Sequence, residues 1–189
     1  MFYVEISRDS RFIISCSRGL QKNLIYWGLE TGQKIADLAG HTNSVFCACF
    51  SKNGLNAASG SGDKTVRTWN LKKIKQEDEF DHGSFIKSIK FLDLKKMLVS
   101  VGEDINVIIW NLVDKSRYAV LSGQNQPIQK VLVTDNEKFI ISGDLYDGIQ
   151  VWNVKQRKQV FAFSYQEEAA SWLSENKIEL DLLKRFLKA

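Results

Sequence analysis

The chain has little of what a metal site or a disulfide framework requires. Its 189 residues include two histidines and three cysteines, and they contain no Cys-x-x-Cys pair. Cys47 and Cys49 alternate with apolar neighbours in a strand-like run, so we interpret the cysteines as buried thiols. Neither a metal nor another cofactor is therefore expected.

Long apolar runs are also missing. The sequence has no apolar stretch of about 18 residues, no signal-peptide pattern and no Asn-x-Ser/Thr sequon. We expect an intracellular, cytoplasmic protein with no membrane contact, and the nucleus is the alternative location. The net charge is +4, but no dense block of lysine and arginine accompanies it. A nucleic-acid partner is therefore not expected.

What the chain does have is a tandem repeat marked by tryptophan. Four tryptophans follow one another at intervals of 42, 41 and 42 residues: Trp27, Trp69, Trp110 and Trp152. A serine lies ten residues before each of them, at Ser17, Ser59, Ser100 and Ser142. Eighteen residues before the last three serines lie His41, His82 and Gln124. A period of a little over 40 residues indicates propeller blades.

The repeated residues resemble those of the WD-repeat family. His41 is similar to the Gly-His pair of that family, and Ser59, Asp63 and Trp69 match its serine, its turn aspartate and its terminal Trp-Asp, with Asn70 in place of Asp. The resemblance extends over residues 2–165. It implies a structural hydrogen-bonded chain within each blade, from Trp through Ser and His to Asp.

The resemblance implies two complete sets of these four residues. The first is His41, Ser59, Asp63 and Trp69, and the second is His82, Ser100, Asp104 and Trp110. The other two repeats depart from the pattern. In the last repeat Gln124 replaces the histidine, and Asp147 lies five rather than six residues before Trp152. In the first repeat Gln21 stands at the aspartate position, and the histidine would fall before Met1.

Each repeat is predicted to form four short antiparallel strands, separated by turn residues. The predicted strands are 3–7, 12–17, 24–28 and 35–38; 45–50, 56–59, 65–70 and 76–80; 86–91, 97–101, 107–112 and 117–121; and 128–134, 139–142, 149–154 and 159–163. The predicted fold is therefore all-β. Residues 1–165 form four four-stranded blades with approximate bounds 2–42, 43–83, 84–125 and 126–165, and residues 166–189 form a C-terminal α-helical tail.

The tail is predicted to be amphipathic. From residue 167 it has no glycine or proline, and Ile178, Leu182 and Phe186 share one stripe of a helix. Its predicted interface consists of the large apolar residues Trp172, Leu183, Phe186 and Leu187. Docking in a partner's groove and packing on the last blade are both open at this point.

Four repeats are fewer than the seven or eight blades typical of the family. Four blades would span roughly half a circle and leave open edges. The chain could be a fragment or lie embedded in a partner. Two copies could close an eight-bladed ring as a homodimer. The half ring could also be covered by its own tail or by another protein, and a closed ring of four is the weakest alternative.

The two sets of His, Asp and Ser invite a comparison with a catalytic triad. Ser59, however, is predicted at a buried strand end, and the set occurs twice. We therefore predict that the chain is not an enzyme. The expected function is a scaffold for protein–protein interaction and complex assembly. The alternative is a fragment, or a regulatory or targeting domain, of a larger multidomain enzyme or RNA-processing machine.

The antiparallel order also predicts where a partner binds. The connections between blades and those between the second and third strands open on the same face. The resemblance implies capture of a protein or peptide there. The candidate residues in these connections are Asn43, Lys64, Phe85, Glu103, Ile105, Gln126 and Tyr146. Phe85 and Tyr146 are the expected anchors, because aromatic residues dominate interface hot spots, although Phe85 fits the core equally well.

Overall fold

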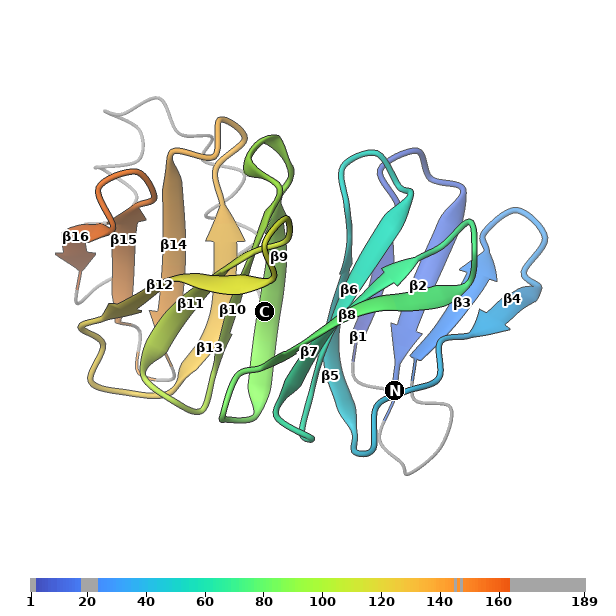
Figure 1. The fold of residues 1–189 in the computed structure, drawn as a ribbon, viewed down its shortest axis with the longest axis horizontal. Helices are drawn as coiled ribbons and strands as arrows, with labels where there is room; N and C mark the ends of the chain where they lie inside the picture. Colours follow the sequence, from blue (N-terminus) through green and yellow to red (C-terminus); the bar gives the residue numbers. More distant parts are fainter. Residues whose placement is uncertain (1–2, 18–23, 145, 147, 164–189) are drawn as a thin grey trace.

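The computed structural model describes residues 3–17, 24–144, 146 and 148–163. These residues form four antiparallel sheets of four strands each, together with one short 3-10 helix, η1 (Asp93–Lys95) (Figure 1). The first sheet contains β1 (Tyr3–Ile6), β2 (Phe12–Cys16), β3 (Leu24–Gly28) and β4 (Lys34–Asp37), and the second contains β5 (Val45–Phe50), β6 (Asn56–Ser61), β7 (Thr65–Asn70) and β8 (Lys75–Asp81). The third contains β9 (Ile86–Leu92), β10 (Met97–Gly102), β11 (Asn106–Asn111) and β12 (Ser116–Ser122), and the fourth contains β13 (Ile128–Val133), β14 (Phe139–Asp144), β15 (Ile149–Asn153) and β16 (Lys158–Phe163).

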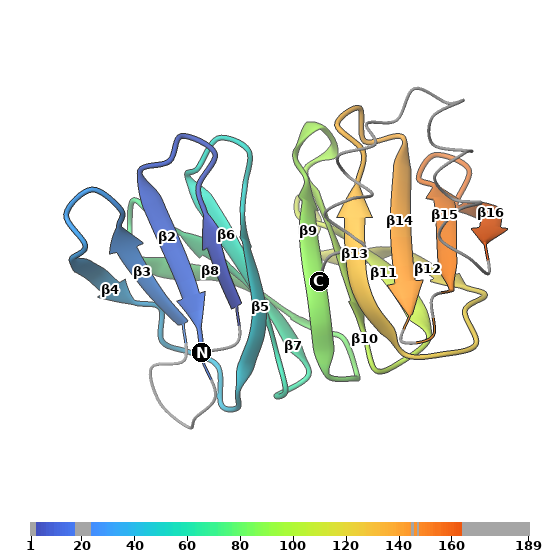
Figure 2. The same cartoon turned by 180° about the vertical axis from the view of Figure 1, so that it is seen from behind.

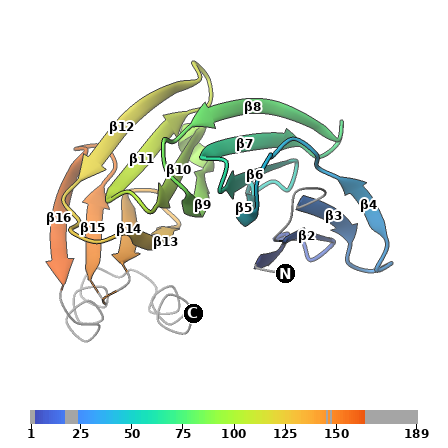
Figure 3. The same ribbon diagram turned by 90° about the horizontal axis from the view of Figure 1, so that it is seen from below.

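The four sheets are arranged as blades around a common axis. Within each sheet the strands are paired in chain order. The first strands lie innermost, with β5 packed against both β1 and β9, and β13 packed against β9. Figure 3 shows that the blades form an open arc with the first and fourth blades at its ends, and Figure 2 shows the same order from behind. The predicted all-β fold with a partial ring is confirmed, and the closed ring of four is wrong. The tail predicted at 166–189 lies outside the described residues.

The apolar core is divided among the three junctions between neighbouring blades. At each junction, the face of one blade that carries its tryptophan packs on the opposite face of the preceding blade. Trp69 packs with Ile14 and Tyr26 of the first blade, and Trp152 packs with Val99 and Ile109 of the third. Trp110 belongs in the same way to the cluster between the second and third blades. Each blade is therefore stabilised by its neighbours.

Polar contacts between blades lie near the axis. The Glu5 carboxylate of β1 accepts a hydrogen bond from the Lys90 Nζ of β9 (2.8 Å) and from the backbone N–H of Phe50 in β5 (3.3 Å). Asp93 accepts from the backbone N–H of Lys52 (3.0 Å). Glu5 thus connects three consecutive blades through one partly buried carboxylate.

In the part of the chain that the structure describes, no helix is long and apolar enough to cross a membrane.

The turns that close the blades contain residues in the left-handed backbone conformation. Between the third and fourth strands of each blade this position is taken by Gly32 (φ 64°), Ile74 (φ 50°), Lys115 (φ 59°) and Arg157 (φ 54°). Only glycine adopts this conformation without steric cost, and β-branched residues are the least suited to it. Ile74 therefore carries local strain in an exposed turn.

We predict that Ile74→Asn stabilises the protein by about 1 kcal/mol, because asparagine tolerates the left-handed region better than isoleucine. Ile74 is 47% exposed, so the substitution removes little buried apolar surface. The matched control is Ile105→Asn, at a residue that is 44% exposed and does not have a positive φ. Equilibrium unfolding in urea measures both variants. An equal or lower stability of Ile74→Asn would contradict the prediction.

Candidate interaction face and its buried polar network

Each blade holds its tryptophan through one repeated hydrogen bond. In the second blade the Trp69 Nε1–H donates to Ser59 Oγ (2.8 Å), and Trp69 lies directly opposite Ala57 on the neighbouring strand. The serine is two residues beyond that partner and therefore on the same face of the sheet. The corresponding bonds are Trp110 to Ser100 (2.7 Å) and Trp152 to Ser142 (2.8 Å). All three serines are fully buried.

The first blade follows the same register but uses a different serine. Ser17 is the predicted partner of Trp27, and this prediction is wrong, because the Trp27 Nε1–H donates to Ser15 Oγ (2.8 Å). Trp27 pairs with Ile13, so the serine again lies two residues beyond the cross-strand partner. The chain between the two residues is 12 positions long here and 10 in the second blade. The hairpin of the first blade is two residues longer, so the serine lies two positions further from the tryptophan in sequence. Its place opposite the tryptophan on the sheet is unchanged.

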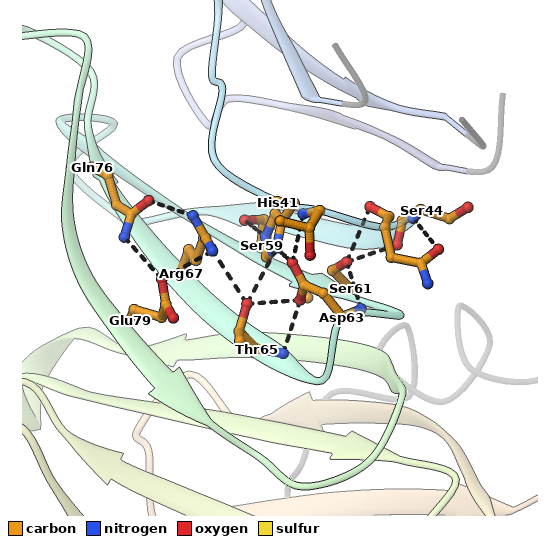
Figure 4. A network of polar contacts seen from close by, with 12 residues as sticks. His41, Ser44, Ser59, Ser61, Asp63, Thr65, Arg67, Gln76 and Glu79 are labelled. Carbon is orange, nitrogen blue, oxygen red and sulfur yellow. Dashed lines mark hydrogen bonds and ion pairs between the residues drawn. The ribbon is translucent and has the colours of Figure 1, made fainter. Parts of the chain in front are cut away.

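The network of the second blade continues from the serine to the loops (Figure 4). His41 Nε2 lies 2.7 Å from Ser59 Oγ, and His41 Nδ1 lies 2.8 Å from Asp63 Oδ2. The side chains of His41 and Asp63 are 2% and 6% exposed. Asp63 also accepts the backbone N–H of Thr42 (3.0 Å) and that of Thr65 (2.9 Å). The carboxylate therefore connects the loop before the blade to the turn between β6 and β7.

The third blade repeats this arrangement with the two ring nitrogens exchanged. His82 Nδ1 lies 2.9 Å from Ser100 Oγ, and His82 Nε2 lies 2.9 Å from Asp104 Oδ1. In both blades one ring nitrogen of the histidine faces the serine hydroxyl and the other faces the aspartate carboxylate. The tryptophan N–H donates to the same serine oxygen, so each polar group of the set has a partner.

In the fourth blade the series of hydrogen bonds ends at the serine. Gln124 occupies the histidine position and is 1% exposed, and neither polar atom of its side chain has a hydrogen-bond partner in the described structure. Asp147 lies outside the described residues. Asp144, which the sequence did not single out, accepts the backbone N–H groups of Tyr146 (2.8 Å) and Gly148 (2.9 Å) in the turn after β14.

Sequence reasoning also missed the residues that extend the second network outward. The Thr65 hydroxyl donates to Asp63 Oδ1 (2.7 Å), and Arg67 Nη1 donates to Gln76 Oε1 (2.8 Å). Arg67 also forms an ion pair with Glu79 (2.9 Å). One signal was present in the sequence. In both complete sets a polar residue follows the aspartate by two positions, Thr65 after Asp63 and Asn106 after Asp104 (3.3 Å).

The predicted binding residues lie in the connections at one edge of the arc, the lower edge in Figure 1. Three large apolar side chains are exposed there: Phe85 by 36%, Ile105 by 44% and Tyr146 by 70%. Asn43 and Lys64 are exposed and Gln126 is half-buried. Glu103 forms an ion pair with Lys87 (3.0 Å). The predicted tail residues Trp172, Leu183, Phe186 and Leu187 lie outside the described residues.

The serine hydroxyls beside the two histidines are shielded from solvent. Ser59 and Ser100 are 0% exposed, so their hydroxyl oxygens cannot reach a substrate. Among the residues described, no group of three or more His, Cys, Asp or Glu side chains could hold a metal ion. Burial also raises the pKa of the Cys16 thiol to about 12, which keeps it protonated and unreactive. The polar network therefore orders the loops.

The fold defines a protein of propeller-type blades, and comparison with known proteins identifies the repeat. Residues 32–70 match the family model described as WD domain, G-beta repeat. The U3 small nucleolar RNA-associated protein 15 homolog of Xenopus laevis is 27% identical over 174 residues, which cover 91% of this chain and 33% of that protein. Residues 32–70 thus match one WD repeat, and the structure forms four sheets of the same four-stranded kind.

Two further relatives are similar over most of the chain. The U3 snoRNP-associated protein-like EMB2271 of Arabidopsis thaliana is 25% identical over 157 residues, covering 82% of this chain and 32% of that protein. The serine-threonine kinase receptor-associated protein of Gallus gallus is 26% identical over 162 residues, covering 85% of this chain and 45% of that protein. The chain thus spans between about a third and a half of the length of these curated relatives.

We predict that Asp63→Ala lowers the free energy of unfolding by about 1–3 kcal/mol, because it leaves His41 and two backbone N–H groups without their acceptor. The control is Asp135→Ala, at an exposed turn residue, which should change stability by less than about 0.5 kcal/mol. Urea unfolding of both variants measures the difference. Equal losses would show that the Asp63 network does not stabilise the second blade.

Stability should also depend on pH through the two aspartates. Burial alone would raise the pKa of Asp63, but its hydrogen bonds with His41 and Thr65 outweigh burial and hold the pKa below the ordinary value of 3.8. His82 and Asn106 similarly lower the pKa of Asp104 against the effect of burial. The unfolded state therefore binds more protons than the folded state as the pH falls below about 5.

The free energy of unfolding should consequently be fully retained above about pH 5 and decrease as the pH falls toward the lowered pKa values. Urea titrations between pH 3 and pH 7 test this. The variant Asp63→Asn should have a smaller slope of stability against pH than the wild type. Identical slopes would rule out Asp63 as a source of the acid sensitivity.

Proposed function

We propose that this chain is a noncatalytic WD-repeat scaffold that binds a protein partner through the connections at the lower edge of the arc in Figure 1. The observation that carries the proposal is the exposure of Phe85, Ile105 and Tyr146 at one edge, in loops of the third and fourth blades. Large apolar side chains that are exposed together are typical of binding surfaces.

The buried network supports this proposal because it fixes the loops before a partner binds. In the second blade, Asp63 connects the backbone of Thr42 to that of Thr65. A loop that is already ordered loses less conformational entropy on binding. The residues that hold the loops are repeated in the second and third blades, whereas the exposed residues of these two blades differ. The exposed residues of each blade would therefore supply specificity.

The relatives support a place in a multiprotein assembly. Two of them carry names that associate them with the U3 small nucleolar RNA or its ribonucleoprotein particle. We infer that this chain acts as a protein-binding subunit, or as part of a longer protein, in an RNA-processing assembly, with a nuclear location. Contact with the assembly is assigned to its proteins rather than its RNA, because the net charge is only +4.

A second copy of the chain could close the open arc into a ring. Each copy supplies four blades, so two copies would form an eight-bladed ring. The fourth blade of one copy would then pack on the first blade of the other. The monomer has a mass of 21.6 kDa, so the pair would have a mass of 2 × 21.6 = 43.2 kDa. Light scattering across a dilution series distinguishes the monomer of 21.6 kDa from the pair of 43.2 kDa.

We predict that Tyr146→Asp weakens association with the protein partner by roughly 30-fold, the change that corresponds to a hot spot of about 2 kcal/mol. The matched control is Leu94→Asp. Leu94 is 69% exposed, Tyr146 is 70% exposed, and Leu94 lies in η1 on the opposite edge. Quantitative co-purification of the full chain from its own cells measures association. Equal retention of partners by the two variants would refute the proposed face.

A further inference from the structure

The two ends of the arc expose different kinds of blade face. Along a strand, side chains alternate between the faces of a sheet, and residues directly opposite on neighbouring strands share a face. We call the side of each blade that carries its tryptophan the tryptophan face, and the other side the opposite face. At the three junctions, a tryptophan face packs on an opposite face. The arc therefore ends with the tryptophan face of the first blade and the opposite face of the fourth.

The end formed by the first blade is exposed to solvent. Its tryptophan face contains Ile6, Ile13 and Trp27, which lie directly opposite one another on β1, β2 and β3. Ile6 is 52% exposed and Val4, on the same face, is 41% exposed. These are large fractions for apolar side chains on the face that is buried in the other three blades.

The end formed by the fourth blade differs sharply in exposure. Its opposite face contains Ile141 and Val151, directly paired between β14 and β15, and Ile149 two residues before Val151. Ile141 is 1% exposed, Val151 is 1% exposed and Ile149 is 2% exposed. They lie outside the clusters at the three junctions between described blades. Apolar side chains that point away from the third blade are therefore buried.

The opposite face of the fourth blade is apolar across all four strands. Leu132 of β13 lies opposite Ile141, and Phe161 of β16 lies opposite Val151. Phe163 lies opposite Ile149, and its ring stacks on that of Phe161 with a centroid separation of 6.1 Å. Each of the four strands thus contributes an apolar side chain to this face, which also carries Lys130, and Phe161 at its edge is 40% exposed. The apolar side chains are stabilised by a covering surface.

We propose that residues 164–189 cover this face, with the stripe of Ile178, Leu182 and Phe186 packed on Ile141, Ile149 and Val151. The segment follows Phe163 directly, and Phe163 itself lies on the face. A segment attached at the edge of its binding surface closes only a short loop, which keeps the entropic cost low.

The dimensions of the segment agree with this placement. If residues 167–189 form a helix, they span about 35 Å at 1.5 Å per residue. A six-residue strand spans about 20 Å, and four strands side by side span about 15–20 Å. The segment is therefore long enough to cross the whole sheet, even if Ser174, Glu175 and Asn176 divide it into two helices. The apolar stripe is long enough to reach the inner strands.

One consequence is that the arc has one covered end and one open end. The face that a second copy would require on the fourth blade is already occupied by the chain itself. The chain should therefore remain a monomer of 21.6 kDa. The tryptophan face of the first blade, with Val4 and Ile6, then remains as the exposed end of the arc.

The experiment uses methyl-labelled isoleucine in the full chain, observed by NMR. The test variant is Leu182→Gln with Phe186→Gln, and the control variant is Lys184→Gln, on the polar side of the predicted helix. The test variant should shift the δ1-methyl resonances of Ile141 and Ile149 and leave those of Ile14 and Ile89 unchanged. Ile14 and Ile89 lie in the junction clusters, so their unchanged resonances show that the blades remain folded.

Three results would overturn the proposal. If the resonances of Ile13 and Ile25 shift instead, the segment covers the first blade. If no isoleucine resonance shifts and the wild-type mass is 2 × 21.6 = 43.2 kDa, a second copy covers the fourth blade. If no resonance shifts and the wild type is a monomer, the segment does not touch the described blades. The result for Lys184→Gln must match the wild type in every case.

Discussion

The structure depends on the burial of sheet faces against one another. Each blade is a four-stranded sheet with apolar side chains on both faces, so it is stable only between two covering surfaces. The internal junctions provide these surfaces for Trp69, Trp110 and Trp152, each of which is at most 3% exposed. The same requirement explains the ends of the arc. Wherever the next blade is absent from the described structure, the outward face needs another partner.

Burial of the tryptophans creates a second requirement, because the indole N–H must have an acceptor. The serine hydroxyl accepts the hydrogen bond of the indole N–H, and it also contacts the histidine ring. The histidine in turn contacts the aspartate, so each buried polar group has a partner. The chain of hydrogen bonds thus begins in the core and ends at the loops. In the fourth blade it ends at Ser142, where Gln124 replaces the histidine and Asp144 organises the turn instead.

These two requirements separate the structural residues from those available for recognition. Trp69, Trp110 and Trp152 and their serine partners are buried, and the bond to histidine occurs in the second and third blades. The exposed residues of the lower edge differ between blades and are free of that requirement, so they can vary with the partner. The outward faces of the end blades form a different kind of surface, which carries apolar side chains such as Ile6 and Ile141. The chain therefore has one edge of exposed connections and two outward blade faces.

The period of the tryptophans determined the number of blades. The strand order within each blade followed from the short turns, because a short turn places consecutive strands side by side. The period also indicated His41, Ser59 and Asp63, whose spacing is the same in the third blade. Counting ten residues back from Trp27 gave Ser17, which is the wrong serine. The hairpin between β2 and β3 is two residues longer than its counterpart in the second blade, so the serine that lies two residues beyond the cross-strand partner of Trp27 is Ser15. Only the tertiary structure revealed that the two end faces differ in exposure. Burial of Ile141 and Val151 depends on surfaces that approach from distant parts of the chain, and no local pattern encodes that approach.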